Sequence, residues 1–296
     1  MEEKVQAKKK DHTFFFLLMT DQMQCIITAL KAESDPFIHH LKLRRDSNFK
    51  FPCFRNDDLG IVLIGVGVGK KNIRSRINNF FRSVDSNSIQ FINVGIAGGR
   101  KNSARLGELF LINKIIDELK SKPYYPDVLT NSPIKENSLT TVKKQIVDGG
   151  EQYDTLVDME ASEIFDVCST FISVHNIAFL KIVSDHMDIG DNNFDHESIR
   201  SLIIKRMDQI MDFIEKFKLI GQLSGPILSD IDMDWIELNR EKYLLTETQV
   251  NQLLNSAKRF RLKNSSALFP QLDIKGPTSK TDRKKIFQDI RAQLKA

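Results

Sequence analysis

Short apolar runs alternate along the sequence with longer segments in which apolar residues recur every three or four positions. The short runs are typical of buried strands and are found at 25–30, 49–54, 60–66, 89–94, 106–112, 138–142 and 177–183. The longer segments predict helices at 36–41, about 70–81, 161–171 and 199–219. This alternation predicts an α/β fold with three layers, α/β/α, around a mixed, mostly parallel central sheet.

Local signals place the start of the first helix. Asp35 is followed by Pro36, a pair typical of an N-cap and the first helical residue. Glu33 is therefore expected on a loop between the first strand and this helix.

The sequence changes character near residue 222. Residues 222–229 are rich in turn-forming residues and predict a linker. We therefore expect one domain at 1–221, of which 1–13 are disordered, and a separate extension at 222–296.

The extension is expected to be helical. Thr246 and Gln249 form the pattern of a capping box, which predicts a helix through about residue 262, and a last helix is predicted at 279–294. We see no catalytic motif in the extension. It is expected to pack on the core or on a partner.

Composition narrows the class of protein. The 296 residues are 41% hydrophobic and 28% charged, as in ordinary soluble proteins. The three cysteines, Cys25, Cys53 and Cys168, form no C-x-x-C pair, and their odd number argues against a disulfide framework. The apolar run at 14–19 is shorter than the core of a signal peptide, and no run has the length of a membrane span. We expect a cytoplasmic protein that does not contact a membrane.

The net charge of +4 is unevenly distributed. Residues 234–296 contain 13 Lys and Arg against 7 Asp and Glu. Acidic residues are interspersed among the basic ones, and aromatic residues are not, so the pattern favours solvated helix faces over a nucleic-acid surface. The histidines form no H-E-x-x-H pattern, and the adjacent His39 and His40 would point apart on a helix. Neither a metal nor another cofactor is expected.

Candidate chemistry concentrates between residues 156 and 188. Glu160 lies at the start of the predicted helix 161–171, and Asp185 lies just past the predicted strand 177–183. Open α/β sheets form ligand crevices at the carboxyl ends of their strands. The two carboxylates are therefore expected to face one pocket.

Several motifs carry a resemblance to a known family. The sequence V-D-M-E-A at 157–161, followed by Ser184-Asp185, resembles the V-E-M-E-A and S-D pair of the purine nucleoside phosphorylase and methylthioadenosine/S-adenosylhomocysteine nucleosidase superfamily. Three more segments resemble the superfamily's S-G-I-G-K turn, N-T-G-S-A-G-G segment and V-G-D-I-V-V strand, in that order: 66–70, 93–99 and 106–112. The resemblance ends near Phe217 and covers about three quarters of the chain.

The resemblance implies a nucleoside phosphorylase-like fold and a division of roles. Asp185 is expected to protonate the departing purine, Glu160 to accept hydrogen bonds from the ribose, and Glu33 to activate water. Met159 is expected to pack beneath the sugar. Glycine-rich turns let backbone N–H groups approach an anion or a hydroxyl, and further substrate contacts are expected from Ser184, Ala97, Gly98, Gly67 and Gly69. The partner would be a small-molecule nucleoside, and relatives are usually homo-oligomers.

The sequence also departs from the superfamily. Val66 stands where the nucleosidases have a Ser that helps form the nucleophile site. Residues 116–157 span roughly half the usual length and lack the Phe that stacks on the purine. Tyr124 and Tyr125 are candidates to replace that Phe, although a surface loop position explains them better. Phe194 is a candidate lid anchor. The substrate's base and 5′ group therefore do not follow from the resemblance.

Three functions remain open from the sequence. Glu33 favours a nucleosidase that hydrolyses a purine nucleoside or a 5′-modified adenosine. A phosphorylase would use orthophosphate as co-substrate, bound by Lys70, the backbone of 65–69 and Arg100. A non-catalytic nucleoside-binding or interaction module is suggested by Val66, the shortened middle segment and the C-terminal extension.

Overall fold

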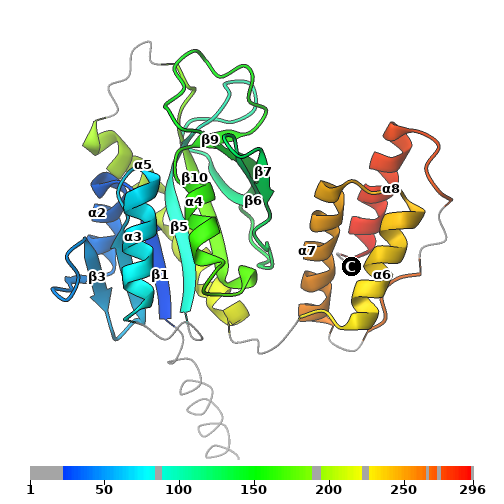
Figure 1. Cartoon of the computed structure of the whole chain (residues 1–296), viewed down its shortest axis with the longest axis horizontal. Helices are drawn as coiled ribbons and strands as arrows, with labels where there is room; N and C mark the ends of the chain where they lie inside the picture. The colour runs from blue at the N-terminus through cyan, green and yellow to red at the C-terminus, as the bar shows by residue number, and fades with distance from the viewer. Residues whose placement is uncertain are drawn as a thin grey trace, which may run out of the picture. The chain divides into compact units, whose positions relative to one another are not determined.

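A computed structural model describes residues 23–83, 89–188, 195–221, 227–264, 267–271 and 275–294. The described chain divides into two compact units (Figure 1). The first holds the residues up to 126 and those from 134 to 221, and the second holds 127–133 and the residues from 227 onward. The predicted disorder at 1–13 and the candidate lid residue Phe194 lie outside the described residues.

The first unit is built on one mixed sheet. Its strands are β1 (Met23–Thr28), β2 (Arg44–Arg45), β3 (Cys53–Asn56), β4 (Ile61–Gly65), β5 (Ile89–Gly98), β6 (Leu109–Asp117), β7 (Lys122–Tyr124), β8 (Lys135–Thr141), β9 (Leu156–Asp158) and β10 (Ile177–Asp185). The middle of the sheet, in the order β4-β1-β5-β10, is parallel. These strands are buried along almost their whole length, as expected for parallel strands covered on both faces.

Part of the sheet closes on itself. β10 pairs with both β5 and β6, β6 pairs with β8, β8 with β9, and β9 returns to β5. The ring β5-β10-β6-β8-β9 therefore forms a small closed barrel that shares β5 and β10 with the open part of the sheet. This closure depends on β9, a strand of only three residues.

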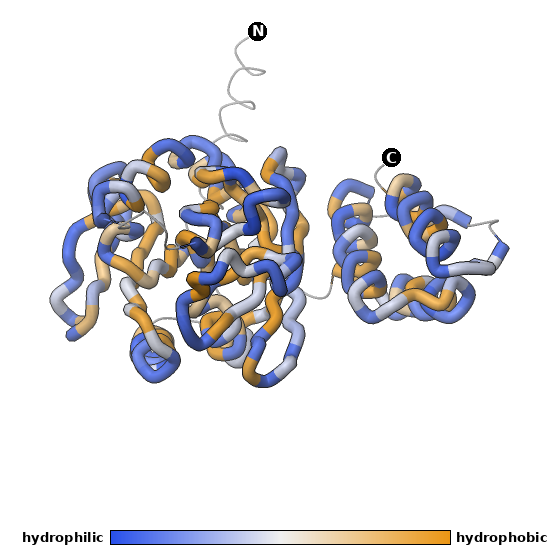
Figure 2. The backbone as a smooth tube through the Cα atoms, turned by 90° about the horizontal axis from the view of Figure 1, so that it is seen from above, coloured by the Kyte–Doolittle hydropathy of each residue, from blue (hydrophilic) through white to orange (hydrophobic). Residues whose placement is uncertain are grey.

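Two helical layers cover the sheet. The helices of the first unit are α2 (Lys31–His40), α3 (Lys70–Phe81), α4 (Ala161–Cys168) and α5 (His196–Gly221), and a short 3-10 turn, η2 (Val174–Asn176), precedes β10. α2 packs against α5 on one face and α3 packs against α4 on the other (Figure 1). The predicted three-layer α/β/α architecture with a mixed sheet is confirmed. Figure 2 shows hydrophobic residues gathered inside the first unit and mostly hydrophilic residues along its periphery.

Several predicted element boundaries are wrong. α2 begins at Lys31 with Leu30 as its N-cap, so Asp35 and Pro36 lie inside the helix instead of starting it. The predicted strands 49–54 and 106–112 are shifted toward the C-terminus, to β3 and β6. β10 continues through Asp185, which is therefore the last residue of the strand instead of the residue after it.

The second unit is a helical bundle of α6 (Asp230–Lys242), α7 (Glu247–Lys263) and α8 (Lys280–Gln293). These helices share a core of buried aliphatic and aromatic side chains, which includes Ile236, Tyr243, Leu253, Phe260, Phe287 and Ile290. Segment 127–133 packs with them: Lys258 forms an ion pair with Asp127, and Arg259 donates to the carbonyl of Val128. The bundle therefore has a hydrophobic core of its own.

The capping boxes of the bundle follow from local sequence. The Thr246 hydroxyl accepts a hydrogen bond from the Gln249 amide, and the Gln249 side chain accepts one from the Thr246 amide. Ser229 and Asp232 form the same arrangement at the start of α6, a helix that the apolar pattern does not predict. None of the helices in the described part of the chain combines the length and the apolar character that a membrane span requires.

Candidate functional site

A pocket of about 290 Å³ opens at the carboxyl ends of the parallel strands of the first unit. β1 contributes the residues that follow it, β5 ends at Gly98, and β10 ends at Ser184 and Asp185. Residues 157–160 contribute the end of β9 and the start of α4. The volume lies near the lower end of the range for small-molecule sites, about 300–1,000 Å³, and the position is the one where α/β sheets bind ligands.

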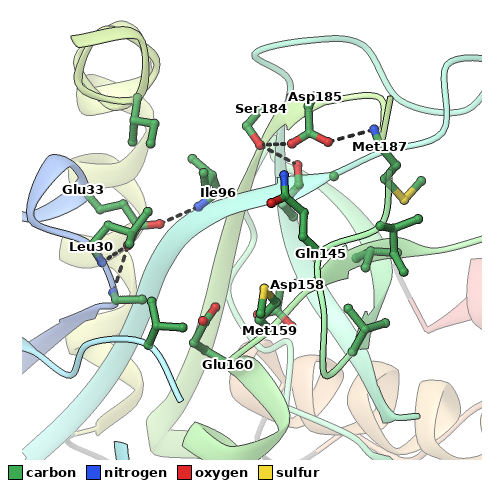
Figure 3. A pocket seen from close by; sticks show the side chains of 18 residues that line it. Leu30, Glu33, Ile96, Gln145, Asp158, Met159, Glu160, Ser184, Asp185 and Met187 are labelled. Atoms are coloured by element: carbon green, nitrogen blue, oxygen red, sulfur yellow. Dashed lines mark hydrogen bonds between the residues drawn. The ribbon is translucent and has the colours of Figure 1, made fainter. Parts of the chain in front are cut away.

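Asp185 is held at one side of this pocket by two hydrogen bonds (Figure 3). Its Oδ1 accepts a hydrogen bond from the Met187 amide at 2.8 Å, and its Oδ2 lies 2.6 Å from the Ser184 hydroxyl. The same hydroxyl lies 3.3 Å from the carbonyl oxygen of Ala97. Ser184 can therefore donate either to Asp185 or to Ala97. The hydroxyl can accommodate both a protonated and an ionised Asp185.

Glu33 projects from the first turn of α2 and is only 3% exposed. Its Oε2 accepts hydrogen bonds from the amides of Ala29 and Leu30, each at 2.9 Å, and its Oε1 accepts one from the Ile96 amide at 3.0 Å. Glu33 thus starts α2 and ties it to β5, which explains why the helix begins earlier than the Asp35-Pro36 pair predicts. Burial raises the pKa of Glu33, although the nearby Lys181 and these three amides oppose the shift.

A buried lysine lies among the carboxylates of the pocket. The Lys181 Nζ on β10 lies 3.0 Å from Asp158 Oδ2, and the two side chains are only 3% and 1% exposed. Burial opposes the charge on Lys181, but Asp158, Glu33 and Glu160 together outweigh it and raise its pKa. Asp158 also accepts hydrogen bonds from the Thr141 hydroxyl and the Ala161 amide, so it holds the start of α4 in place.

Glu160 has an unusually basic carboxylate. Its burial, together with the negative charges of Asp158 and Glu33, raises its pKa to about 8, against the opposing effect of Lys181. In Figure 3 the carboxylates of Glu33 and Glu160 lie toward one end of the pocket, and Ser184 and Asp185 lie toward the other. The pocket therefore has one end with two carboxyl groups of raised pKa and another end with a hydrogen-bonded carboxyl group.

The structure brings most of the predicted site residues together. Those that line the pocket are Glu33, Ala97, Gly98, Met159, Glu160, Ser184 and Asp185. Gly67 and Gly69 are not among the described lining residues, although Val68 between them is. Both glycines have positive φ angles, 70° and 94°, which glycine adopts most readily. The geometry of the turn therefore explains these two glycines without a role in binding. Val66 is fully buried.

The other predicted candidates are placed elsewhere. Tyr124 lies on β7, is buried, and donates a hydrogen bond from its hydroxyl to Asp166. Neither Tyr124 nor Tyr125 is among the described residues that line the pocket. The cations proposed to bind phosphate are paired with acids: Lys70 with Asp117 at 3.2 Å and Arg100 with Asp154 at 3.0 Å. Neither cation is a lining residue in the described part of the chain.

Sequence reasoning missed several residues of the site. The sequence could have indicated Lys181, because it is a single cation within an otherwise apolar strand and such a cation requires a buried counter-charge. Val142, Gln145 and Ile146 also line the pocket. Val142 ends the predicted strand 138–142, and the other two residues follow it in a segment for which no helix or strand is predicted. We find no feature of the sequence that would have placed Gln145 there.

The loop that carries Gln145 is fastened to the end of β10. The Gly149 amide donates to the carbonyl of Met187 at 2.7 Å, and Asp148 and Asp188 form an isolated β-bridge. Met187 packs so closely that a Cβ added to Gly98 would lie 2.6 Å from its Cγ, and one added to Gly150 would lie 2.5 Å from its Sδ. A side chain at either position would displace Met187, and Gly150 also has a positive φ of 59°, which favours glycine. Among the described residues, no group of three or more His, Cys, Asp or Glu side chains is placed to hold a metal ion.

Among known proteins, similarity is found to solved structures only. No protein-family model matches the sequence, and no curated protein matches it significantly. Similar solved structures include the 5′-methylthioadenosine nucleosidase of Arabidopsis thaliana, at 15% identity over 68% of this chain and 99% of that one, with a TM-score of 0.56. The 5′-methylthioadenosine/S-adenosylhomocysteine nucleosidase of Campylobacter jejuni has 16% identity, coverages of 66% and 99%, and a TM-score of 0.52.

A third structure is the corresponding nucleosidase of S. pneumoniae with a transition-state inhibitor, at 15% identity, coverages of 66% and 99%, and a TM-score of 0.54. Each similar chain is covered almost completely, while about a third of this chain extends beyond the match. The resemblance predicted from the sequence motifs is thus confirmed at the level of the fold. This chain has the fold of the 5′-methylthioadenosine/S-adenosylhomocysteine nucleosidases, which is nucleoside phosphorylase-like.

Proposed function

We propose that the chain hydrolyses the N-glycosidic bond of a purine nucleoside or a 5′-modified adenosine. The observation that carries this proposal is the placement of Glu33, Glu160 and Asp185 around a single pocket at the strand ends. The similarity to nucleosidases of known structure supports the same class of reaction.

Asp185 is the proposed general acid. As the C1′–N9 bond breaks, its electron pair moves onto the purine, and Asp185 gives its proton to N7. The Ser184 hydroxyl, 2.6 Å from Asp185 Oδ2, then turns from the carbonyl of Ala97 and donates to the new carboxylate. Such proton transfer typically contributes on the order of 10²- to 10⁴-fold to the rate.

Glu160 and Glu33 act on the sugar side. Glu160 accepts hydrogen bonds from the ribose hydroxyls, and the negative charge at this end of the pocket stabilises the oxocarbenium-like sugar. A water molecule attacks C1′ and passes one proton to Glu33, whose raised pKa makes it a stronger base than an exposed glutamate. The products are the free purine and the free sugar. Glu33 then releases its proton to solvent and Asp185 takes one up, which restores the starting state.

The charges of the pocket favour water over orthophosphate as the nucleophile. The described lining residues include no arginine or lysine. Lys181, which lies behind the pocket wall, is already paired with Asp158 and faces two more carboxylates. A phosphate anion would therefore find no free cation among the described lining residues, so a phosphorylase is the less well supported reaction.

One observation favours a second candidate, a nucleoside-binding module without catalysis. Both carboxylate oxygens of Glu33 already accept backbone N–H groups, as those of a purely structural residue would. Val66, buried where the relatives are expected to have a Ser, also removes a hydroxyl from the nucleophile site. On this reading the pocket binds a nucleoside and leaves it intact.

Product analysis tests these alternatives together. Purified protein is incubated with adenosine, inosine, guanosine and 5′-methylthioadenosine, with and without phosphate, and products are separated by chromatography. Hydrolysis predicts free base and free sugar at rates that do not depend on phosphate, and it predicts that Glu33→Gln abolishes their release. Sugar 1-phosphate as the main product would instead establish a phosphorylase. Binding without any product would establish the module.

A further inference from the structure

The three-helix bundle of the second unit separates its charges by helix. α6 carries five acidic and two basic residues, whereas α8 carries five basic and two acidic ones. α7 is also basic, with four Lys and Arg against one Glu. When a domain has an acidic surface in one place and a basic surface in another, the acidic surface of one copy is complementary to the basic surface of a second copy.

The acidic surface of α6 is organised as a ridge. Asp230, Asp234 and Glu241 are spaced by four and seven residues, which places them on one side of the helix. All three are exposed, and none forms an ion pair with another residue that the structure describes. This side is opposite to Asp232 and Ile236, which pack into the bundle. The acidic ridge therefore points away from the other helices of its own copy.

Two largely exposed aliphatic side chains flank the acidic ridge. Ile231 is 78% exposed and Leu238 is 64% exposed. They lie seven residues apart, two turns along the same flank of α6. Aliphatic side chains at this spacing beside charged ones are typical of a helix that lies in a groove of a partner.

A groove with the opposite charge lies between the start of α7 and the length of α8. Its volume is about 370 Å³. It is lined by Lys280, Arg283, Lys284, Gln288 and Arg291 from α8, by Gln249 and Gln252 from α7 and its N-cap Thr246, and by Phe287, which is only 5% exposed. Lys280 and Lys284 are exposed, four residues apart, and form no ion pair within the described part of the chain. The groove thus offers cations together with the small exposed part of an aromatic ring.

We propose that the bundle is a self-association module, in which the acidic ridge of α6 in one copy docks into the α7–α8 groove of a second copy. Asp234 and Glu241 would pair with Lys280 and Lys284, and Leu238 would contact Phe287. The two surfaces differ, so the contact is heterologous: a copy that offers its ridge still has a free groove. Association of this kind continues into rings or open chains of copies.

The role of such a module is to bring many first units together. This inference does not depend on the reaction that the first unit catalyses. It would also be separate from any oligomer that the first unit itself forms, because the residues that carry it all belong to the second unit.

The test is charge reversal in the full-length protein, read by sedimentation velocity. The ridge variant is Asp234→Lys/Glu241→Lys and the groove variant is Lys280→Glu/Lys284→Glu. We expect the wild-type protein to associate at about 0.1 M salt and to dissociate at about 1 M, where the Debye length falls from about 10 Å to about 3 Å. Each variant alone should associate at least about tenfold more weakly at low salt. An equimolar mixture of the two should associate as the wild type does, since their altered surfaces are again complementary.

Matched controls separate the contact from net charge. Lys285→Glu and Asp289→Lys change exposed residues of α8 that do not line the groove, and they should leave association unchanged. Ile231→Ser removes an aliphatic side chain without changing charge and should weaken association. The proposal is overturned if the wild type has one mass at both salt concentrations, if the controls weaken association as much as the paired variants do, or if the mixture of ridge and groove variants stays dissociated.

Discussion

Removal of the Lys181 charge should destabilise the first unit severely, because the buried carboxylates of Asp158 and Glu33 and the half-buried carboxylate of Glu160 face it. Lys181→Met keeps an unbranched side chain of similar length and deletes only the ammonium group. Asp158, only 1% exposed, then loses its partner at 3.0 Å. Breaking a buried ion pair from one side costs about 3–5 kcal/mol. We expect a loss of this size in the free energy of unfolding at about pH 8, measured by urea denaturation.

The loss should depend on pH in a defined direction. The pKa values of Glu33 and Glu160 are already raised, and loss of Lys181 raises both further. A carboxylate with a raised pKa contributes stability that is present at low pH and is lost as pH rises through the folded-state pKa. The deficit of Lys181→Met should therefore shrink when the protein is unfolded at about pH 5, where the carboxylates take up protons.

Two controls define the mechanism. Asp158→Asn added to Lys181→Met removes the stranded charge and should recover a large part of the lost stability. Lys216→Met breaks an exposed pair with Asp212 and should cost no more than about 1 kcal/mol. If Lys181→Met costs as little as Lys216→Met, or if its cost is the same at both pH values, the Lys181 ammonium does not stabilise the buried carboxylates.

Two further predictions concern the same pocket. The first concerns the dissociation constant of a nucleoside for the Asp185→Asn variant, measured by calorimetry from about pH 6 to about pH 9. It should fall by up to about tenfold per pH unit as Glu160 ionises, and it should level off above the raised pKa of Glu160, about 8. A flat profile would mean that the ribose hydroxyls do not need ionised Glu160. The second is that Gly98→Ala should reduce kcat/KM by more than about tenfold and cost about 1–3 kcal/mol of stability, because its Cβ would lie 2.6 Å from Met187 Cγ. The control Gly276→Ala, whose nearest contact would be at 3.4 Å, should change neither quantity measurably. Equal behaviour of the two variants in kinetic and melting assays would contradict the tight packing at Met187.

Much of the α/β core could be predicted because its signals are local. The strand at 60–66 and the helix ending at Phe81 follow from apolar runs and spacing, and the structure has them as β4 and α3. The start of α2 could not be predicted in this way, because it is set by Glu33, whose carboxylate joins residues far apart in sequence. α6 was missed because two of its three buried residues, Asp232 and Asn239, are polar.

The candidate site was predictable where a motif carried it and not elsewhere. Asp185, Glu160 and Glu33 were found through sequence motifs, and the structure places all three at one pocket. The closure of the barrel depends on pairings of strands as short as β9, which leave no periodic signal. Gln145 reaches the pocket only because its loop is pinned to Met187 and Asp188, contacts that no local pattern encodes.

The most direct measurement of the proposed chemistry compares base release by the wild type and by Asp185→Asn on the best nucleoside substrate. The substitution keeps the size of the side chain and its ability to accept from the Met187 amide, but it cannot deliver a proton. We predict that kcat falls by roughly 10²-fold or more while the dissociation constant of the nucleoside changes little, which is the signature of an interaction used in the transition state. Turnover near the wild-type rate would contradict the assignment of Asp185 as the acid and reduce its role to holding the turn at Met187.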